Sequence, residues 1–118
     1  MRSRIILNNP AGSDEINPGL GPINIPAGTT VTVDTLILSD FISANYQVKL
    51  YNTANDKFSG FTMDVNRVST DADFALYMIM GDNISRSVDV SISGSSVLFK
   101  ITNNEAYDLT FDAFKFIS

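Results

Sequence analysis

Hydrophobic and polar residues alternate along most of the chain from residue 29 onward. The alternation is clearest in residues 30–34, 46–50, 61–66, 87–93 and 96–102. A period of two places apolar side chains on one face of an extended strand and polar side chains on the other. The pattern therefore predicts β-strands that have one face in a core and the other in water.

Two stretches depart from simple alternation. Residues 74–80 (Phe-Ala-Leu-Tyr-Met-Ile-Met) are apolar throughout, which predicts a central strand covered on both faces by a second layer or by another subunit. Near the C-terminus, Leu109 and Phe111 occupy odd positions, whereas Phe114 and Phe116 occupy even ones. A one-residue β-bulge between the two pairs would keep all four side chains on the same face.

Turn-forming residues separate the apolar runs at regular intervals, as in the Ser-Gly-Ser link at residues 93–95. One twisted sheet of this size would leave an apolar face open to water, so two layers are needed. The predicted fold class is all-β: a two-layer antiparallel β-sandwich or jelly roll of about eight strands.

The first part of the chain has a different character, because all four prolines lie before residue 27. Proline removes a backbone donor, so this part cannot form a central strand or a long helix. We predict an extended N-terminal arm over residues 1–28 and a sandwich domain over residues 29–118. The apolar side chains expected to carry contacts of the arm with a partner are Ile5, Ile6, Leu7, Ile23 and Ile25. The alternative is a flexible leader without contacts.

Composition and charge exclude several classes of function. A chain of 118 residues is one domain, and 13 acidic against 8 basic residues give a net charge of −5. This balance argues against nucleic-acid binding and against binding to an anionic membrane surface. The chain has no His and no Cys, which excludes disulfides, Cys nucleophiles, His relays and the usual zinc sites. We expect no cofactor, no metal and no membrane span.

Aspartates are the remaining candidates for acid–base chemistry. Asp71 and Asp73 flank Ala72, but they occupy positions typical of turns and do not match paired carboxylates held across a sugar. Residues 52–56 and 70–73 supply oxygen ligands without matching a calcium-binding loop. We therefore expect no enzymatic activity. A hydrolase, the alternative, would lose its activity in Asp71→Asn or Asp73→Asn.

Aromatic residues raise a second alternative, which is sugar binding. The chain has eight Phe, four Tyr and no Trp. Tyr46 lies in the apolar phase of its strand and is predicted to be buried. Tyr51 and Tyr107 fall at strand ends, where an exposed ring could stack on a sugar.

The apolar content exceeds what a small body can bury, which predicts contacts between subunits. The apolar runs at residues 36–38 and 74–80 are the candidates. The side chains expected at a subunit interface are Leu36, Leu38, Tyr77 and Ile79.

Residues 33–117 resemble a β-sandwich domain of tailed-bacteriophage virion proteins, which occurs in capsid decoration (cement) proteins and in tail-fibre or knob proteins. The similar stretches are Asp34-Thr35-Leu36 with Phe41, Ala44-Asn45-Tyr46-Gln47-Val48, the strand 61–68, Met80-Gly81-Asp82-Asn83-Ile84, and the hairpin 88–102. The chain departs from the family at residues 69–71, where Ser-Thr-Asp stands in place of a His-Asp-Gly turn.

The resemblance implies a virion component without chemistry of its own. Because the family's domain often ends a longer fibre protein, the short chain favours a decoration protein on the outside of the capsid. The implied partners are the major capsid protein or other virion proteins. The resemblance also implies that three copies of the chain form a homotrimer. The protein would be made in the host cytoplasm and would then bind the capsid exterior. A receptor- or glycan-binding tail-fibre or knob module is the alternative.

Overall fold

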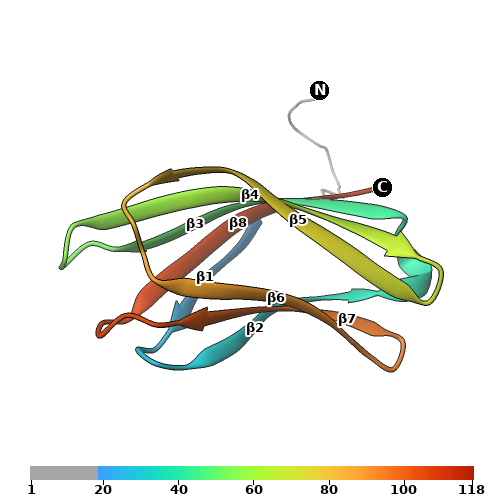
Figure 1. Cartoon of the computed structure of the whole chain (residues 1–118), viewed down its shortest axis with the longest axis horizontal. Coiled ribbons are helices and arrows are strands. Elements are labelled where there is room, and N and C mark those ends of the chain that lie inside the picture. Colours follow the sequence, from blue (N-terminus) through green and yellow to red (C-terminus); the bar gives the residue numbers. More distant parts are fainter. Residues whose placement is uncertain (1–18) are drawn as a thin grey trace, which may run out of the picture.

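The computed structural model describes residues 19–118 and consists of two antiparallel β-sheets, seen as upper and lower layers in Figure 1. The strands are β1 (Gly19–Ile25), β2 (Thr30–Ile37), β3 (Ser43–Asn52), β4 (Lys57–Val68), β5 (Asp71–Gly81), β6 (Arg86–Ser93), β7 (Ser96–Asn103) and β8 (Leu109–Ile117). A short 3-10 turn, η2 (Leu38–Asp40), follows β2. The predicted all-β class, with about eight strands in two layers, is confirmed.

Strand order shows how the chain ties the two layers together. The larger sheet has the order β1-β8-β3-β4-β5, and the smaller sheet has the order β2-β7-β6. Tight antiparallel pairs join β3 to β4, β4 to β5 and β6 to β7, whereas the other four connections pass from one sheet to the other. The layers are therefore held by repeated crossings of the backbone as well as by their shared core.

The core lies between the sheets and follows from the period-two pattern. On β3 the buried residues are Ala44, Tyr46, Val48 and Leu50, at every second position. Phe99 of β7 makes edge-to-face ring contacts with Tyr46 and with Phe111 of the opposite sheet, at centroid distances of 4.9 and 5.9 Å. Each such ring contributes about 2–3 kcal/mol through burial alone, so this cluster anchors one sheet on the other.

One polar group of contacts lies within the core. The Asp34 Oδ2 atom on β2 accepts hydrogen bonds from the Tyr46 hydroxyl at 2.7 Å and from the Lys115 ammonium at 3.0 Å. The Asp34 and Lys115 side chains retain only 13% and 21% exposure, and Tyr46 is fully buried. The carboxylate thus links the smaller sheet to two strands of the larger one.

We predict a loss of stability at alkaline pH that depends on Tyr46. Burial, followed by the hydrogen bond and the charge of Asp34, raises the Tyr46 pKa above its ordinary value of 10.0. Above pH 10 the unfolded chain releases this proton and the folded chain retains it, so stability falls by about 1.4 kcal/mol per pH unit. Urea unfolding between pH 9 and 11.5 should show a shallower decline in Tyr46→Phe. The control Tyr51→Phe, which changes a half-buried ring outside the core, should retain most of the decline.

The structure corrects the prediction for residues 74–80. They lie in β5, which is an edge strand of the larger sheet and not a central one. The smaller sheet has three strands against five, so it does not cover the margin of its partner. Phe74, which shares the inner face with Val65, is therefore exposed. Tyr77, on the outer face, and the three residues after it are exposed as well.

The bulge predicted in the last strand is also absent. The pairing of β8 with β3 runs without a shift from Ile117 opposite Ala44 to Thr110 opposite Tyr51. Along an unbroken strand, residues at odd and even positions face opposite sides. Leu109 and Phe111 therefore enter the core, whereas Phe114 and Phe116 face outward.

The boundary predicted at residue 28 lies too far along the chain. Residues 19–25 form β1, which pairs antiparallel with β8 and belongs to the sandwich. The proline at position 22 is compatible with this place because an edge strand needs donors on one side only. The pairing shifts between Leu20 and Ile23, around Pro22. The remainder of the predicted arm, residues 1–18, lies outside the described residues.

Candidate binding surface

The outer face of the larger sheet carries aromatic side chains where an alternating strand would normally place polar ones. Phe114 and Phe116 on β8 project from this face and are 52% and 50% exposed. Their cross-strand neighbours on β3 are polar: Gln47 lies opposite Phe114, and Asn45 lies opposite Phe116. The combination of exposed aromatic rings and polar neighbours is characteristic of contact surfaces.

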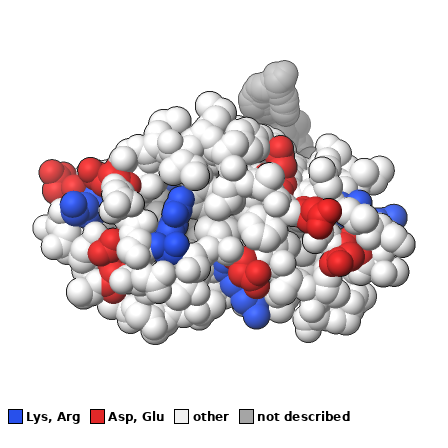
Figure 2. Space-filling model, viewed as in Figure 1, with Lys and Arg blue, Asp and Glu red and all other residues white. Residues whose placement is uncertain are grey.

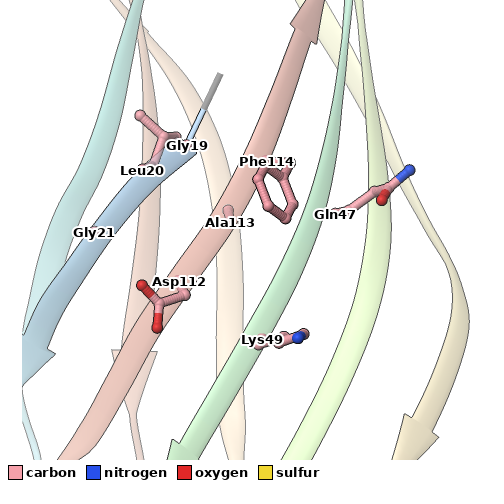
Figure 3. A pocket seen from close by; sticks show the side chains of 8 residues that line it. All are labelled: Gly19, Leu20, Gly21, Gln47, Lys49, Asp112, Ala113 and Phe114. Atoms are coloured by element: carbon pink, nitrogen blue, oxygen red, sulfur yellow. The ribbon is translucent and has the colours of Figure 1, made fainter. Parts of the chain in front are cut away.

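A shallow hollow of about 340 Å³ opens beside Phe114. Figure 3 shows the Phe114 ring next to Gln47, with Lys49 further along β3 and Asp112 further along β8. The residues that line the hollow are Gly19, Leu20, Gly21, Gln47, Lys49, Asp112, Ala113 and Phe114. Strand β1 forms one side, so the hollow lies where the described chain begins.

Gly21 allows β1 to approach β8 closely enough to form this wall. Its φ of +97° lies in a region that side-chain-bearing residues rarely adopt. A Cβ atom at this position would collide with the Phe111 carbonyl oxygen and would lie 2.9 Å from the Asp112 Oδ1 atom. A glycine is therefore required here on both conformational and steric grounds.

Hydrogen bonds fix the polar side chains beside the hollow. The Tyr51 hydroxyl donates to Asp112 Oδ2 at 2.6 Å, and this bond raises the pKa of Tyr51. The Tyr51 ring also stacks on Phe58 of β4, with centroids 6.3 Å apart and an interplanar angle of 12°. Asp112 is thus held on the outer face, directly opposite Lys49.

A second group of hydrogen bonds lies further across the same face. The Asn45 amide donates to Asp64 Oδ1 at 2.7 Å and to the Tyr77 hydroxyl at 3.3 Å. Burial first, and then the neighbouring Asp64, raises the pKa of Tyr77. These contacts join β3, β4 and β5, so the polar part of the surface is preorganised around the aromatic part.

The hollow combines an exposed aromatic ring with hydrogen-bonding groups and a single carboxylate. Asp112 is the one carboxylate lining the hollow, so the pair needed for glycoside hydrolysis is missing there. No group of three metal-ligating side chains occurs within residues 19–118. Over that same range, no helix has the length and apolar character needed to span a membrane. On the face drawn in Figure 2, acidic and basic side chains occur in small groups with uncharged surface between the groups.

The residues predicted for contacts fall in three different environments. Ile25 and Leu36 are core residues, so the predicted roles of Ile25 in the arm and of Leu36 in a subunit interface are wrong for the folded sandwich. Ile23 and Leu38 are half-buried and pack against the core. Tyr77 and Ile79 are exposed on β5, where a partner could reach them. Ile5, Ile6 and Leu7 lie outside the described residues.

The tyrosines and the aspartate considered for sugar binding and acid–base chemistry lie in different surroundings. Tyr46 is fully buried, as predicted. Tyr107 is half-buried against the core, whereas Tyr51 is only partly accessible because of its bond to Asp112 and its stack on Phe58. Asp71 begins β5, and its Oδ1 accepts a hydrogen bond from the next backbone amide at 2.8 Å.

Phe114 and Phe116 are the surface residues that the sequence analysis missed. The signal was present in the change of phase between Phe111 and Phe114. The predicted bulge keeps every phenylalanine inside, whereas the unbroken strand gives the same pattern with an aromatic outer face.

Comparison with known proteins assigns no family to the chain. No protein-family model matches the chain, and no curated protein matches its sequence at a significant level. The fold and the surface define a small two-sheet β-sandwich protein with an aromatic outer face.

Proposed function

We propose that the chain is a structural protein of a phage virion, a capsid decoration (cement) protein that binds the outside of the assembled head. The observation that carries the proposal is the pair of half-exposed rings, Phe114 and Phe116, on a sheet face that should otherwise be polar. The two-layer sandwich is compatible with the resemblance to virion domains. That resemblance is what directs the proposal to a phage head.

The outer face has the features of a protein-binding surface. It is broad, its hollow is shallow, and its two aromatic anchors have hydrogen-bonded polar neighbours such as Asn45 and Asp112. A protein that binds the assembled shell and not its free subunits stabilises the shell by mass action. The net charge of −5 would keep the free protein soluble before it docks.

The arm would act on the same side of the sandwich. Gly19, the first described residue, lies beside the hollow and opposite Phe114. The described chain therefore begins next to the aromatic face. In this proposal Ile5, Ile6 and Leu7 extend the contact over the shell, while Ile25 holds β1 in the core.

Co-sedimentation with shells that lack the protein tests the role of the face. We expect Phe114→Asp to weaken shell binding at least tenfold, because it places a carboxylate in a contact that needs an apolar anchor. The control is Ile37→Asp, which changes an exposed apolar residue on β2 of the other sheet. Equal binding by wild type, Phe114→Asp and Ile37→Asp would contradict the proposal.

A chain that starts at Gly19 tests the arm. Removal of residues 1–28 would also remove β1 and expose the edge of β8, so a cut at residue 19 is the cleaner variant. If the truncated chain has a native thermal transition and binds shells as tightly as the full chain, the arm has no role in docking.

The hollow also supports a second candidate, a receptor- or glycan-binding module. Phe114 offers an aromatic face, and Gln47, Lys49 and Asp112 offer hydrogen-bonding groups around it. A glycan array separates the two functions. Reproducible binding to a sugar, lost in Phe114→Ala, would favour the module, whereas shell binding without sugar binding would favour decoration.

A further inference from the structure

The four sheet edges of the sandwich differ in how well they are protected against pairing with another chain. Edge strands are commonly protected by proline, by bulges and by inward-pointing charges. β1 contains Pro22, and β2 has a pairing shift next to the inward-pointing Asp34. β6 directs Arg86 inward over the Phe61 ring, at 4.9 Å from its centroid.

β5 is the least protected edge. Its 11 residues contain no proline and no basic residue, and its acids, Asp71 and Asp73, both lie at its beginning. The next seven residues are uncharged, and Met78, Ile79 and Met80 are 64%, 62% and 61% exposed. One protective device is present, a pairing shift at Met78, whose φ is +53°.

The outer edge of β5 is open to pairing. Within residues 19–118, β5 pairs with β4 alone, and it is the last strand of its sheet. Its outward amide and carbonyl groups can therefore accept a further extended strand. Two β5 strands from different copies complement each other when they run antiparallel, because the acidic beginning of each strand then faces the uncharged end of the other. Parallel pairing would place Asp73 beside its own copy.

We propose that two copies of the chain associate through antiparallel pairing of their β5 edges, which joins the larger sheets of both copies into one sheet about a twofold axis. Such a contact uses the same surface on both subunits and closes without forming a fibre. This proposal does not depend on the proposed function. If both hold, the pair presents two copies of the outer aromatic face on one continuous sheet.

The small size of the contact argues for weak association. Seven paired residues extend over about 24 Å. With side chains on both faces of the sheet, such a strip buries roughly 600 Å² in total, which is below the ~1,200 Å² of the smaller stable interfaces. We therefore expect a reversible dimer that forms at micromolar concentrations and not a permanent one.

Sedimentation equilibrium of the full chain between 1 and 500 μM provides the test. We expect the mass to rise from one chain to two. Ile79→Asp should raise the dissociation constant at least tenfold, because antiparallel pairing of residues 74–80 brings the new carboxylate within two residues of the partner copy's Asp73, with Asp71 beyond it. Ile79→Lys should weaken the dimer less than Ile79→Asp does, because the same carboxylates attract an ammonium group. The control Ile37→Asp should stay within twofold of wild type.

Hydrogen exchange on the wild type supplies a readout that does not depend on how well the variants fold. The amides of β5 should exchange more slowly at high than at low protein concentration, while those of β1 and β6 should not change. A monomer at 500 μM overturns the proposal, as does a trimer of the kind that the resemblance implies. A dimer without added protection of β5 amides overturns it as well. Shell binding is measured separately, so failure of this proposal is distinguishable from failure of the decoration role.

Discussion

Asn103→Ala will lower the free energy of unfolding by about 3–5 kcal/mol, a large share of the stability of a domain this size. Among the amide-bearing and charged side chains of residues 19–118, Asn103 alone is fully buried. Its amide donates to the Ile25 carbonyl at 3.0 Å and to the Tyr107 carbonyl at 2.8 Å. Its Oδ1 atom accepts a hydrogen bond from the Glu105 amide at 2.8 Å.

The expected loss is large because one side chain satisfies three backbone groups. Each buried polar group left without a partner costs about 1–3 kcal/mol, and the alanine also leaves a void. The three partners belong to the end of β1 and to the connection between β7 and β8. These hydrogen bonds therefore attach the connection between β7 and β8 to the end of β1.

The neighbouring asparagine provides a matched control. Asn104 is exposed, and its side chain makes a single 3.4 Å hydrogen bond with the Ser87 hydroxyl. Asn104→Ala should therefore change stability by less than about 0.5 kcal/mol. Urea unfolding of both variants at neutral pH measures the difference. A loss below 1 kcal/mol in Asn103→Ala would show that water replaces its bonds, which contradicts the burial described above.

The comparison of Asn103 with Asn104 shows one limit of sequence reasoning. Both residues lie in a polar stretch that the sequence marks as a turn, and their local patterns are equivalent. Only the approach of Ile25 from β1, 78 residues away along the chain, makes one of them a core residue. A contact between distant segments has no signature in the local alternation.

The alternation of apolar and polar residues is sufficient to predict the core residues of a strand that has one buried face. It predicted that Tyr46 and its alternate neighbours Val48 and Leu50 are core residues, and all three are buried. It failed for β5, because an apolar strand has the same pattern whether it is central or lies at an uncovered edge. The place of a strand in its sheet depends on the number of strands in the opposite sheet, which no single strand encodes.

The alternation of apolar and polar residues is sufficient to predict the outward direction of Phe114, but the assumption that every phenylalanine is buried leads to a different result. Placing every phenylalanine in the core required a bulge in β8, and the unbroken pairing with β3 shows that there is none. The outward direction of Phe114 follows from period two alone. The hollow beside it could not be predicted, because it depends on how closely Gly21 lets β1 approach Asp112.

Asp34→Ala will also be strongly destabilising, by about 3 kcal/mol. The substitution leaves the buried Tyr46 hydroxyl without its 2.7 Å acceptor and the largely covered Lys115 ammonium without its 3.0 Å partner. Removing one member of a buried, hydrogen-bonded charge pair costs more than the pair itself contributes, because the remaining groups stay desolvated. Urea unfolding at pH 7 measures the loss.

A double-mutant cycle assigns that loss to the hydrogen bond. Tyr46→Phe alone should cost about 1–2 kcal/mol, and the double variant Asp34→Ala/Tyr46→Phe should cost at least 1 kcal/mol less than the sum of the single changes. The matched cycle uses Asp112 and Tyr51, which form the same kind of bond, at 2.6 Å, on the outer face. Its coupling should be smaller, because water can replace either partner there. Equal coupling in the two cycles would mean that burial between the sheets adds nothing to the Asp34 interaction.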